Sequence, residues 1–312
     1  MPCYYPLPGY RARAVGASGK RGIVFNKKDG FVDRPVSVPC GQCNGCRLER
    51  SRQWAIRCSH EAQLWEDNCF ITLTYADAFL PPGGNLDLPE FQKFMKRLRH
   101  RFGPGVRFFH CGEYGEKYLR PHYHACLFNC DFPDRLLWKI SKSGERLYRS
   151  EILEELWPYG HSSVGDVTFQ SAAYVARYIT KKQTGPTAYN YYSRYDEKSG
   201  QIWTVRPEYV TMSRGSKKLK SGGIGKGWFE KYSSDVYPSD FIIMEGKKMK
   251  PPKYYDRCLE EEAPEEYRKI RWSRITNAKL HAADNTSSRH RVRETVQEAR
   301  LKRLPRSLEG EI

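Results

Sequence analysis

The segment Pro121–Phe128 reads P-H-Y-H-A-C-L-F and decides how the rest of the chain is interpreted. Its aromatic and apolar content predicts a β-strand. Side chains alternate between the two faces of a strand, so His122 and His124 are expected on the same face with their imidazoles close together. Two such nitrogens form half of a divalent-metal site, although paired histidines also occur on sheets by chance.

A carboxylate would complete this site, and Glu113 ends the strand predicted just before it, at Val106–Glu113. The short polar connection between the two strands favours a hairpin that returns His122 beside Glu113. Two imidazoles and one carboxylate leave coordination positions open, and this set of nitrogen and oxygen ligands suits catalytic Mg²⁺ or Mn²⁺. Glu116 is the alternative ligand, and a surface glutamate without a metal is the alternative interpretation.

Outward from these strands, helical and extended patterns alternate. The residue spacing predicts a helix from Arg47 to about Asp67 and a strand at Cys69–Tyr75. Asp87 begins D-L-P-E, a capping box that opens a helix to about Phe102. Three more elements are predicted: a helix at Glu151–Trp157, an extended segment at His161–Thr168 and a helix at Gln170–Lys182.

This order, β-α-β-β-α-β followed by a helix, predicts an α+β protein with a ferredoxin-like (RRM-like) antiparallel sheet and helices on one face. Residues 1–46 are rich in Pro, Gly and Cys and are expected to form loops and short turns. Residues 47–235 are expected to form the main domain. Residues 236–312 form a charged extension, helical from about Pro264, whose function the sequence leaves open.

A second cluster of reactive side chains lies in the last predicted helix, S-A-A-Y-V-A-R-Y-I-T-K-K. Tyr174 and Tyr178 are four residues apart and share a helix face, with Lys181 and Lys182 one turn beyond. A phenol has a pKa of about 10, so it needs a nearby cation to attack as a phenolate. An amphipathic helix with two packed tyrosines explains the same spacing.

Cys40, Cys43 and Cys46 form C-x-x-C-x-x-C, and Cys3 is the natural fourth partner. Four thiolates suit a structural Zn²⁺ ion, while buried unligated thiols and an iron–sulfur cluster are the alternatives. Most of the other cysteines are expected in the core; they are Cys58, Cys69, Cys111, Cys126, Cys130 and Cys258. No signal segment or run of ~18 apolar residues is evident, so we expect a reduced, cytoplasmic protein without a membrane span.

The charge of the chain points to a polyanionic partner. Its 53 Lys and Arg against 36 Asp and Glu give a formal charge of +17, which favours nucleic acid. The 21 tyrosines and 7 tryptophans offer flat surfaces on which unpaired bases can stack. A basic protein without such a partner is the alternative.

One glycine-rich segment, between Arg214 and Lys226, contains five basic residues and no acid, which suits a track for phosphates. A solvated basic loop is the alternative. The residues expected to contact DNA are Arg177, Arg214, Lys217, Lys218, Lys220 and Lys226. Within this segment, G-G-I-G-K-G lacks the spacing of a Walker loop and its Ser or Thr, so no nucleotide cofactor is expected.

Three segments resemble, in order, motifs of a known superfamily: F-I-T-L-T-Y at Phe70–Tyr75, R-P-H-Y-H-A at Arg120–Ala125 and Y-V-A-R-Y-I-T-K-K at Tyr174–Lys182. With them the chain resembles replication initiators of the HUH endonuclease superfamily, most closely those of small single-stranded DNA phages of the gokushovirus branch. The resemblance covers most of residues 1–235 and not the tail. The basic insertion G-S-K-K-L-K-S-G departs from it.

The resemblance implies that residues 47–235 form a metal-dependent nickase that initiates rolling-circle replication in the host bacterial cytoplasm. His122, His124 and, by analogy, Glu113 would hold the metal. A tyrosine would attack the scissile phosphate, leaving a 5′-phosphotyrosine and a free 3′-OH, with nearby lysines stabilising the charge. The implied partners are single-stranded DNA at a replication origin and the host replication helicase or polymerase.

Two other functions compete with this one. The first is a non-catalytic, zinc-containing module that binds single-stranded nucleic acid. The second is a two-histidine RNA phosphodiesterase, for which His161-Ser162-Ser163 supplies a partial second motif.

Overall fold

The computed structural model describes residues 3–17, 19–115, 118–141, 144–177, 182–183, 185–195, 200–215 and 222–303. The chain forms two compact units. One comprises Met1–Arg50 with Arg274–Leu304, and the other comprises Ser51–Ser273 with Pro305–Ile312. Among the described residues, no helix combines the length and apolar character needed to cross a membrane.

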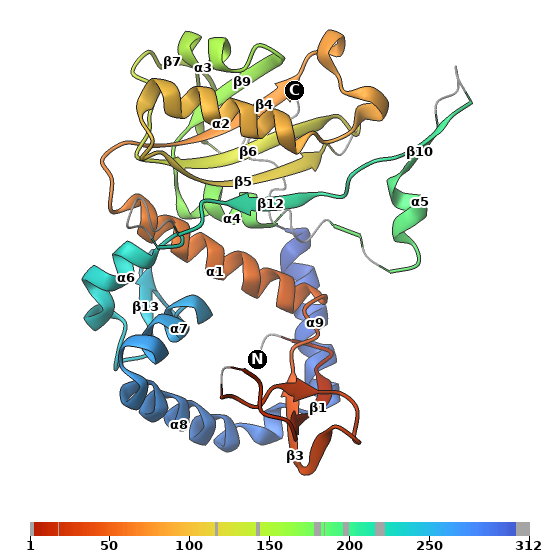
Figure 1. The fold of residues 1–312 in the computed structure, drawn as a ribbon, viewed down its shortest axis with the longest axis vertical. Coiled ribbons are helices and arrows are strands. Elements are labelled where there is room, and N and C mark those ends of the chain that lie inside the picture. The colour runs from red at the N-terminus through yellow and green to blue at the C-terminus, as the bar shows by residue number, and fades with distance from the viewer. Residues whose placement is uncertain are drawn as a thin grey trace. The chain divides into compact units, whose positions relative to one another are not determined.

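The larger unit is built on a seven-stranded sheet with the order β12-β5-β6-β4-β9-β8-β7, in which every pair is antiparallel (Figure 1). Its strands are β4 (Asn68–Tyr75), β5 (Arg107–Tyr114), β6 (Pro121–Phe128), β7 (Leu136–Ile140), β8 (Arg146–Arg149), β9 (Gly160–Gly165) and β12 (Tyr209–Met212). The central order β5-β6-β4-β9 is that of a β-α-β-β-α-β unit. The predicted α+β class and antiparallel sheet are therefore confirmed.

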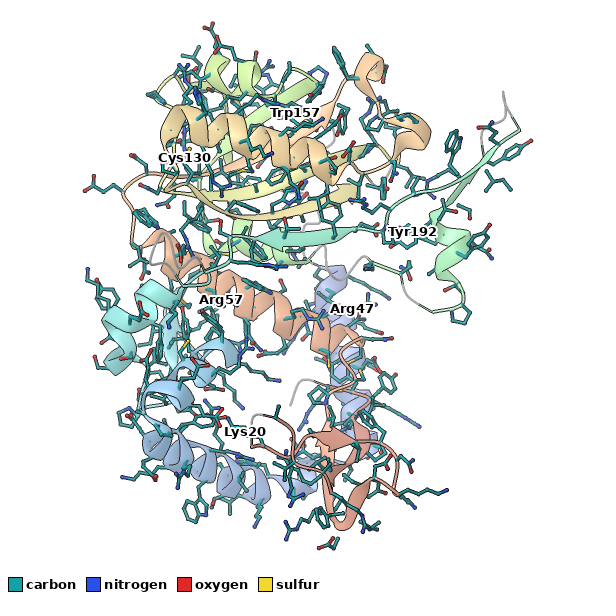
Figure 2. The ribbon with its side chains drawn as sticks, viewed as in Figure 1. Lys20, Arg47, Arg57, Cys130, Trp157 and Tyr192 are labelled. Carbon is teal, nitrogen blue, oxygen red and sulfur yellow. The ribbon has the colours of Figure 1, made fainter. Side chains whose placement is uncertain are left out.

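Helices α2 (Leu88–Phe102) and α3 (Glu151–Leu156) pack against one face of this sheet. The apolar residues of α2 recur at helical spacing and are buried with Trp157, which is labelled in Figure 2. Asp87 caps α2 by accepting a hydrogen bond from the Glu90 N–H at 3.3 Å. The other half of the predicted capping box is absent, because the Glu90 carboxylate accepts from the Tyr75 hydroxyl instead.

The prediction of helices on one face is wrong, since α1 (Asn44–Ala62) and α4 (Phe169–Arg177) cover the other face. The central strands explain this. Phe70 and Cys126 face α1 and α4, whereas Ile71 and Leu127 face α2, so both surfaces of the sheet are apolar. A sheet of that kind needs cover on both sides. Small residues on α4 allow its backbone to approach the strands closely.

Several strands lie where none was predicted. In the smaller unit, β1 (Leu7–Ala12), β2 (Ile23–Val24) and β3 (Gly30–Val38) form a sheet in the segment expected to contain loops and short turns. Few of their residues are buried, so they lack the apolar alternation that marks a strand in sequence. Gly30 is required here, because a Cβ atom at this position would lie 2.4 Å from the Cβ of Tyr10.

The predicted helical tail is confirmed as α8 (Pro264–Leu280) and α9 (Ser287–Lys302), preceded by α7 (Lys253–Glu262). Helix α6 (Lys226–Tyr232) and the β13–β14 hairpin pack with α7 around Phe229 and Tyr255. The remaining bounds are β13 (Ile242–Met244), β14 (Lys247–Met249), α5 (Ala188–Tyr192), β10 (Ser193–Tyr195) and β11 (Ile202–Thr204). The short 3₁₀ helices are Asp77–Phe79, Pro82–Gly84, Ser233–Asp235 and Ala282–Asp284.

An ion pair between the buried Glu61 and the largely buried Arg107 holds the loop before α6 against α1 and β5. Arg107 Nε lies 2.6 Å from Glu61 Oε1, and Arg107 Nη2 donates to the Gly222 carbonyl at 2.9 Å. Glu61 Oε2 accepts from the Gly225 N–H at 2.6 Å. Arg57, labelled in Figure 2, donates from Nε to the Ile224 carbonyl at 2.9 Å. Every charge in this group thus has a hydrogen-bonding partner.

Removing one member of this pair should cost much of the stability of the fold. In Glu61→Ala the largely buried Arg107 guanidinium and the Gly225 N–H lose their partner, which is expected to lower the free energy of unfolding by about 3–5 kcal/mol. Urea denaturation measures the change. The control is Glu66→Ala, at an exposed position just after α1, with an expected change within about 0.5 kcal/mol. Equal stabilities for the two variants would contradict the role given to Glu61.

Candidate active site

The register of the central strands brings the three predicted metal ligands together. Glu113 on β5 is paired with His122 on β6, and His124 is two residues further along the same face. Glu113 Oε1 lies 2.8 Å from His122 Nε2 and 2.9 Å from His124 Nε2. The three ligand atoms all lie within 4.8 Å of one another. Glu116, the alternative ligand, lies outside the described residues.

Hydrogen bonds on the far side of each imidazole fix how the rings point. His122 Nδ1 lies 3.1 Å from the Arg120 carbonyl, and His124 Nδ1 lies 2.9 Å from Thr72 Oγ1. A carbonyl only accepts, so His122 carries its proton on Nδ1. In the neutral ring the Nε2 lone pair then faces the Glu113 carboxylate. Two lone pairs at that distance repel unless a proton or a cation lies between them, so the donor set fits a divalent metal.

The Glu113 carboxylate is almost fully buried, with 1% of its surface exposed. Burial raises its pKa, but when the imidazoles are protonated the charge of His122 and the hydrogen bonds donated by His122 and His124 outweigh burial and lower the pKa to about 2. The carboxylate is therefore ionised across the neutral range, in the form that ligates a cation.

Tyr174 lies on α4 directly against this group. Its ring is buried, with its centroid 5.1 Å from that of His124 and nearly perpendicular to it at 83°. The Arg177 guanidinium lies 5.8 Å from the Tyr174 ring centroid. The helix is described only as far as Arg177, so Tyr178 and Lys181 lie outside the described residues, while Lys182 is described and exposed. The structure thus brings the ring of one predicted nucleophile, Tyr174, against His124.

The described ends of the basic segment lie elsewhere on the sheet. Arg214 follows β12 next to Ser213, which donates its N–H to the Phe108 carbonyl at 2.9 Å. Lys226 follows the loop that Arg107 binds, and its Nζ lies 3.4 Å from Glu230 Oε1. Both ends therefore lie near the start of β5, roughly 20 Å along the strand from Glu113. Lys217, Lys218 and Lys220 lie outside the described residues.

Two further side chains share the face of the site. Thr72 on β4 pairs with His124, and Thr74 pairs with both His122 on β6 and His161 on β9. Thr72 was not singled out in the sequence, although its alternation with Thr74 in F-I-T-L-T-Y matches that of the two histidines. His161 is exposed two strands away from His122, so the partial second motif of a two-histidine phosphodiesterase does face the same side.

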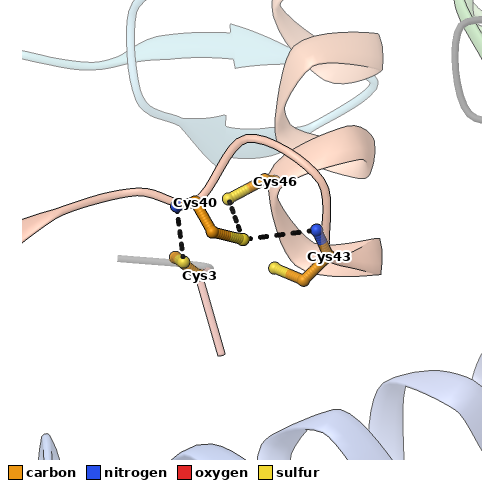
Figure 3. A group of neighbouring side chains, drawn as sticks. All are labelled: Cys3, Cys40, Cys43 and Cys46. Atoms are coloured by element: carbon orange, nitrogen blue, oxygen red, sulfur yellow. Dashed lines mark hydrogen bonds between the residues drawn. The ribbon is translucent and has the colours of Figure 1, made fainter. Parts of the chain in front are cut away.

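The four cysteines predicted as a cluster come together in the smaller unit (Figure 3). Their sulfur atoms all lie within 4.8 Å of one another. Burial raises the pKa of the Cys40 thiol, but hydrogen bonds from the Cys43 and Gln42 N–H groups outweigh it and lower the pKa to about 7. The six scattered cysteines are buried, as predicted for core residues, and none of the ten is in a disulfide.

Residues 68–183 match the family described as replication-associated protein ORF2/G2P. The chain is 33% identical over 277 residues to replication-associated protein VP4 of Bdellovibrio phage phiMH2K, covering 86% of this chain and 80% of that protein. It is 34% identical over 244 residues to replication-associated protein ORF2 of Spiroplasma virus 4, covering 74% and 70%. No solved structure matches the chain. The resemblance to phage replication proteins is confirmed, and the chain belongs to the family of phage replication-associated proteins.

Proposed function

We propose that this protein is a site-specific, metal-dependent endonuclease and strand transferase of the HUH class that initiates rolling-circle replication of a phage genome. The observation that carries the proposal is the convergence of His122 Nε2 and His124 Nε2 on Glu113 Oε1, with Tyr174 packed against His124. Membership of a family whose relatives are named replication-associated proteins supports the biological role.

Glu113, His122 and His124 would hold Mg²⁺ or Mn²⁺, which when bound polarises the scissile phosphate. The protein residues fix that arrangement in advance. The Arg120 carbonyl and Thr72 orient the two rings, and the buried carboxylate supplies a permanent negative charge. Preorganised ligands of this kind need no rearrangement when the substrate arrives.

The covalent step is a transesterification. The Tyr174 oxygen attacks the phosphorus, a new O–P bond forms and the bond from phosphorus to the 3′ oxygen breaks. The phenol proton is lost, and the departing 3′ oxygen takes up a proton to become a free 3′-OH. One phosphodiester replaces another, so the 5′-phosphotyrosine conserves the energy of the broken bond and no nucleotide cofactor is needed. Arg177, near the Tyr174 ring, supplies a positive charge beside the nucleophile.

The products define the partners. The free 3′-OH is a primer for a host polymerase, and displacement of the old strand calls for a host helicase, so we place the reaction in the host bacterial cytoplasm. The substrate is single-stranded DNA at the replication origin, bound through the positive charge and exposed aromatic residues of the chain.

The test uses the full chain and single-stranded oligonucleotides that tile the genome encoding it. With Mn²⁺ or Mg²⁺, a denaturing gel should show one cleaved oligonucleotide and a matching protein–DNA adduct, and a chelator should abolish both. Binding that is equally tight with the chelator and never gives an adduct would favour a non-catalytic module. Metal-independent cleavage of RNA that is lost in His161→Ala would favour a two-histidine phosphodiesterase.

Thr72 gives a further test of how the site is positioned. In Thr72→Val the shape of the side chain is kept but the hydrogen bond to His124 Nδ1 is lost. We expect metal affinity or nicking to fall about 10–100-fold, as for other residues that orient metal ligands. The measurement is the Mn²⁺ concentration that gives half-maximal nicking, which should rise in Thr72→Val and recover in Thr72→Ser. A Thr72→Ser variant as impaired as Thr72→Val would argue against the hydrogen bond.

A further inference from the structure

We infer that Cys3, Cys40, Cys43 and Cys46 bind one structural Zn²⁺ ion, which joins the beginning of the chain to the first turn of α1. The inference does not depend on the nicking reaction. The cluster lies in the unit formed by Met1–Arg50 and Arg274–Leu304, whereas Glu113, His122 and His124 belong to the other unit.

The sulfur positions fit a single tetrahedral ion. Four thiolates at about 2.3 Å from zinc have sulfurs about 3.8 Å apart. Here Cys40 Sγ and Cys46 Sγ are 4.0 Å apart, and all four sulfurs lie within 4.8 Å of one another (Figure 3). A disulfide would require a separation of about 2.05 Å. An iron–sulfur cluster places iron and sulfide between the cysteines, which holds their sulfurs further apart than a single ion does.

The backbone around the cluster is shaped to present thiolates. Gly41 has φ of 76°, a conformation that suits glycine and turns the chain between Cys40 and Cys43. The Cys43 N–H donates to Cys40 Sγ and the Cys40 N–H donates to Cys3 Sγ, both at 3.3 Å. Hydrogen bonds of this kind orient metal ligands and stabilise their negative charge. Cys46 lies in the first turn of α1, which fixes the position of the fourth sulfur.

The segment before α1 has little other means of stabilisation. Among the described residues from Cys3 to Arg50, the only buried hydrophobic residues are Cys3 and Ala12. A three-stranded sheet with so small a core needs an additional stabilising link, such as a bound metal ion. The ion would connect positions 3 and 40, which flank β1, β2 and β3. With four thiolates there is no open coordination position, so the role is structural and not catalytic.

Metal analysis of the full chain tests the assignment directly. We expect about one zinc per chain and no iron in wild type, and no zinc in Cys40→Ser/Cys43→Ser. Two matched variants should keep the zinc. Cys258→Ala removes a cysteine outside the cluster, and His122→Ala/His124→Ala disrupts the other group that could hold a metal among the described residues. Zinc that is absent from wild type, or lost only in the histidine variant, overturns the inference, as does iron in place of zinc.

A second measurement on the wild-type chain covers the case in which the cysteine variant does not fold. Exchange of the ion for Co²⁺ should give the thiolate charge-transfer absorption of a four-sulfur tetrahedral site. Removal of zinc by a zinc-selective chelator, with Mg²⁺ in excess, should accelerate proteolysis within residues 3–40 by about tenfold or more. Cleavage within residues 68–177 should keep its rate. No thiolate band, or unchanged cleavage of residues 3–40, overturns the structural role.

Discussion

Replacing either His122 or His124 by Ala should reduce nicking of single-stranded DNA by about a thousandfold or more while leaving DNA binding largely intact. Each substitution removes one of the two nitrogens that face Glu113 Oε1 at 2.8 and 2.9 Å, whereas affinity comes from basic and aromatic surfaces. Removing a single preorganised electrostatic contact costs about 10²–10³ in rate, and losing a ligand also weakens metal binding. Initial rates of nicking at saturating Mn²⁺, with binding measured separately, give the two effects.

The matched control is His100→Ala, an exposed histidine on α2, which packs against the opposite face of the sheet from the site. It should nick at the wild-type rate. Glu113→Gln adds a test of charge, because it keeps the shape of the side chain and removes the ionised carboxylate that the two histidines stabilise. We expect it to be as inactive as the histidine variants. Metal-dependent nicking by both histidine variants would contradict the metal assignment.

The position of Glu113 could be predicted because strand alternation and a short hairpin leave few registers. One pairing, Glu113 with His122, brings all three ligands to one face. The contacts that orient these ligands could not be predicted in the same way. Thr72 reaches His124 only because β4 lies beside β6 in the sheet, and strand order depends on contacts between residues 52 positions apart.

The strands at the edges of the sheet could not be predicted from the sequence either. Strand β7 has the exposed apolar residues Leu136, Leu137 and Ile140, so its pattern does not alternate. Strand β12 has four residues, all partly exposed, and is recognisable only from its pairing with β5. Alternating apolar and polar residues indicate a strand that is buried on one face. Edge strands with few buried residues lack this alternation, so they are hard to recognise in the sequence. The sequence patterns were informative where the core is deepest, at β4 and β6.

Two tyrosines spaced four residues apart suit a reaction that must occur twice. A rolling-circle initiator cuts once to start and again to release a completed circle while it still holds the first DNA end. A spacing of four residues in a helix corresponds to about 6 Å along the axis on one face. Tyr174 packs against His124, and a second phenol at that spacing could take its turn at the same phosphate. The alternative is that one tyrosine attacks while the other only packs.

We therefore expect Tyr174→Phe and Tyr178→Phe each to form a covalent adduct with DNA, in unequal amounts, and the double variant to form none. Phenylalanine keeps the ring that contacts His124 and Phe70, so loss of the adduct reports lost chemistry and not lost packing. Mass spectrometry of the DNA-linked peptide identifies the ring that carries the phosphate. Tyr192→Phe is the control, because that buried tyrosine donates to Glu208 and belongs to the core on the other face of the sheet. Adducts on only one tyrosine would contradict the alternating use of both residues, but they would still identify that tyrosine as the nucleophile. An adduct that survives in the double variant would mean that a different residue attacks the phosphate.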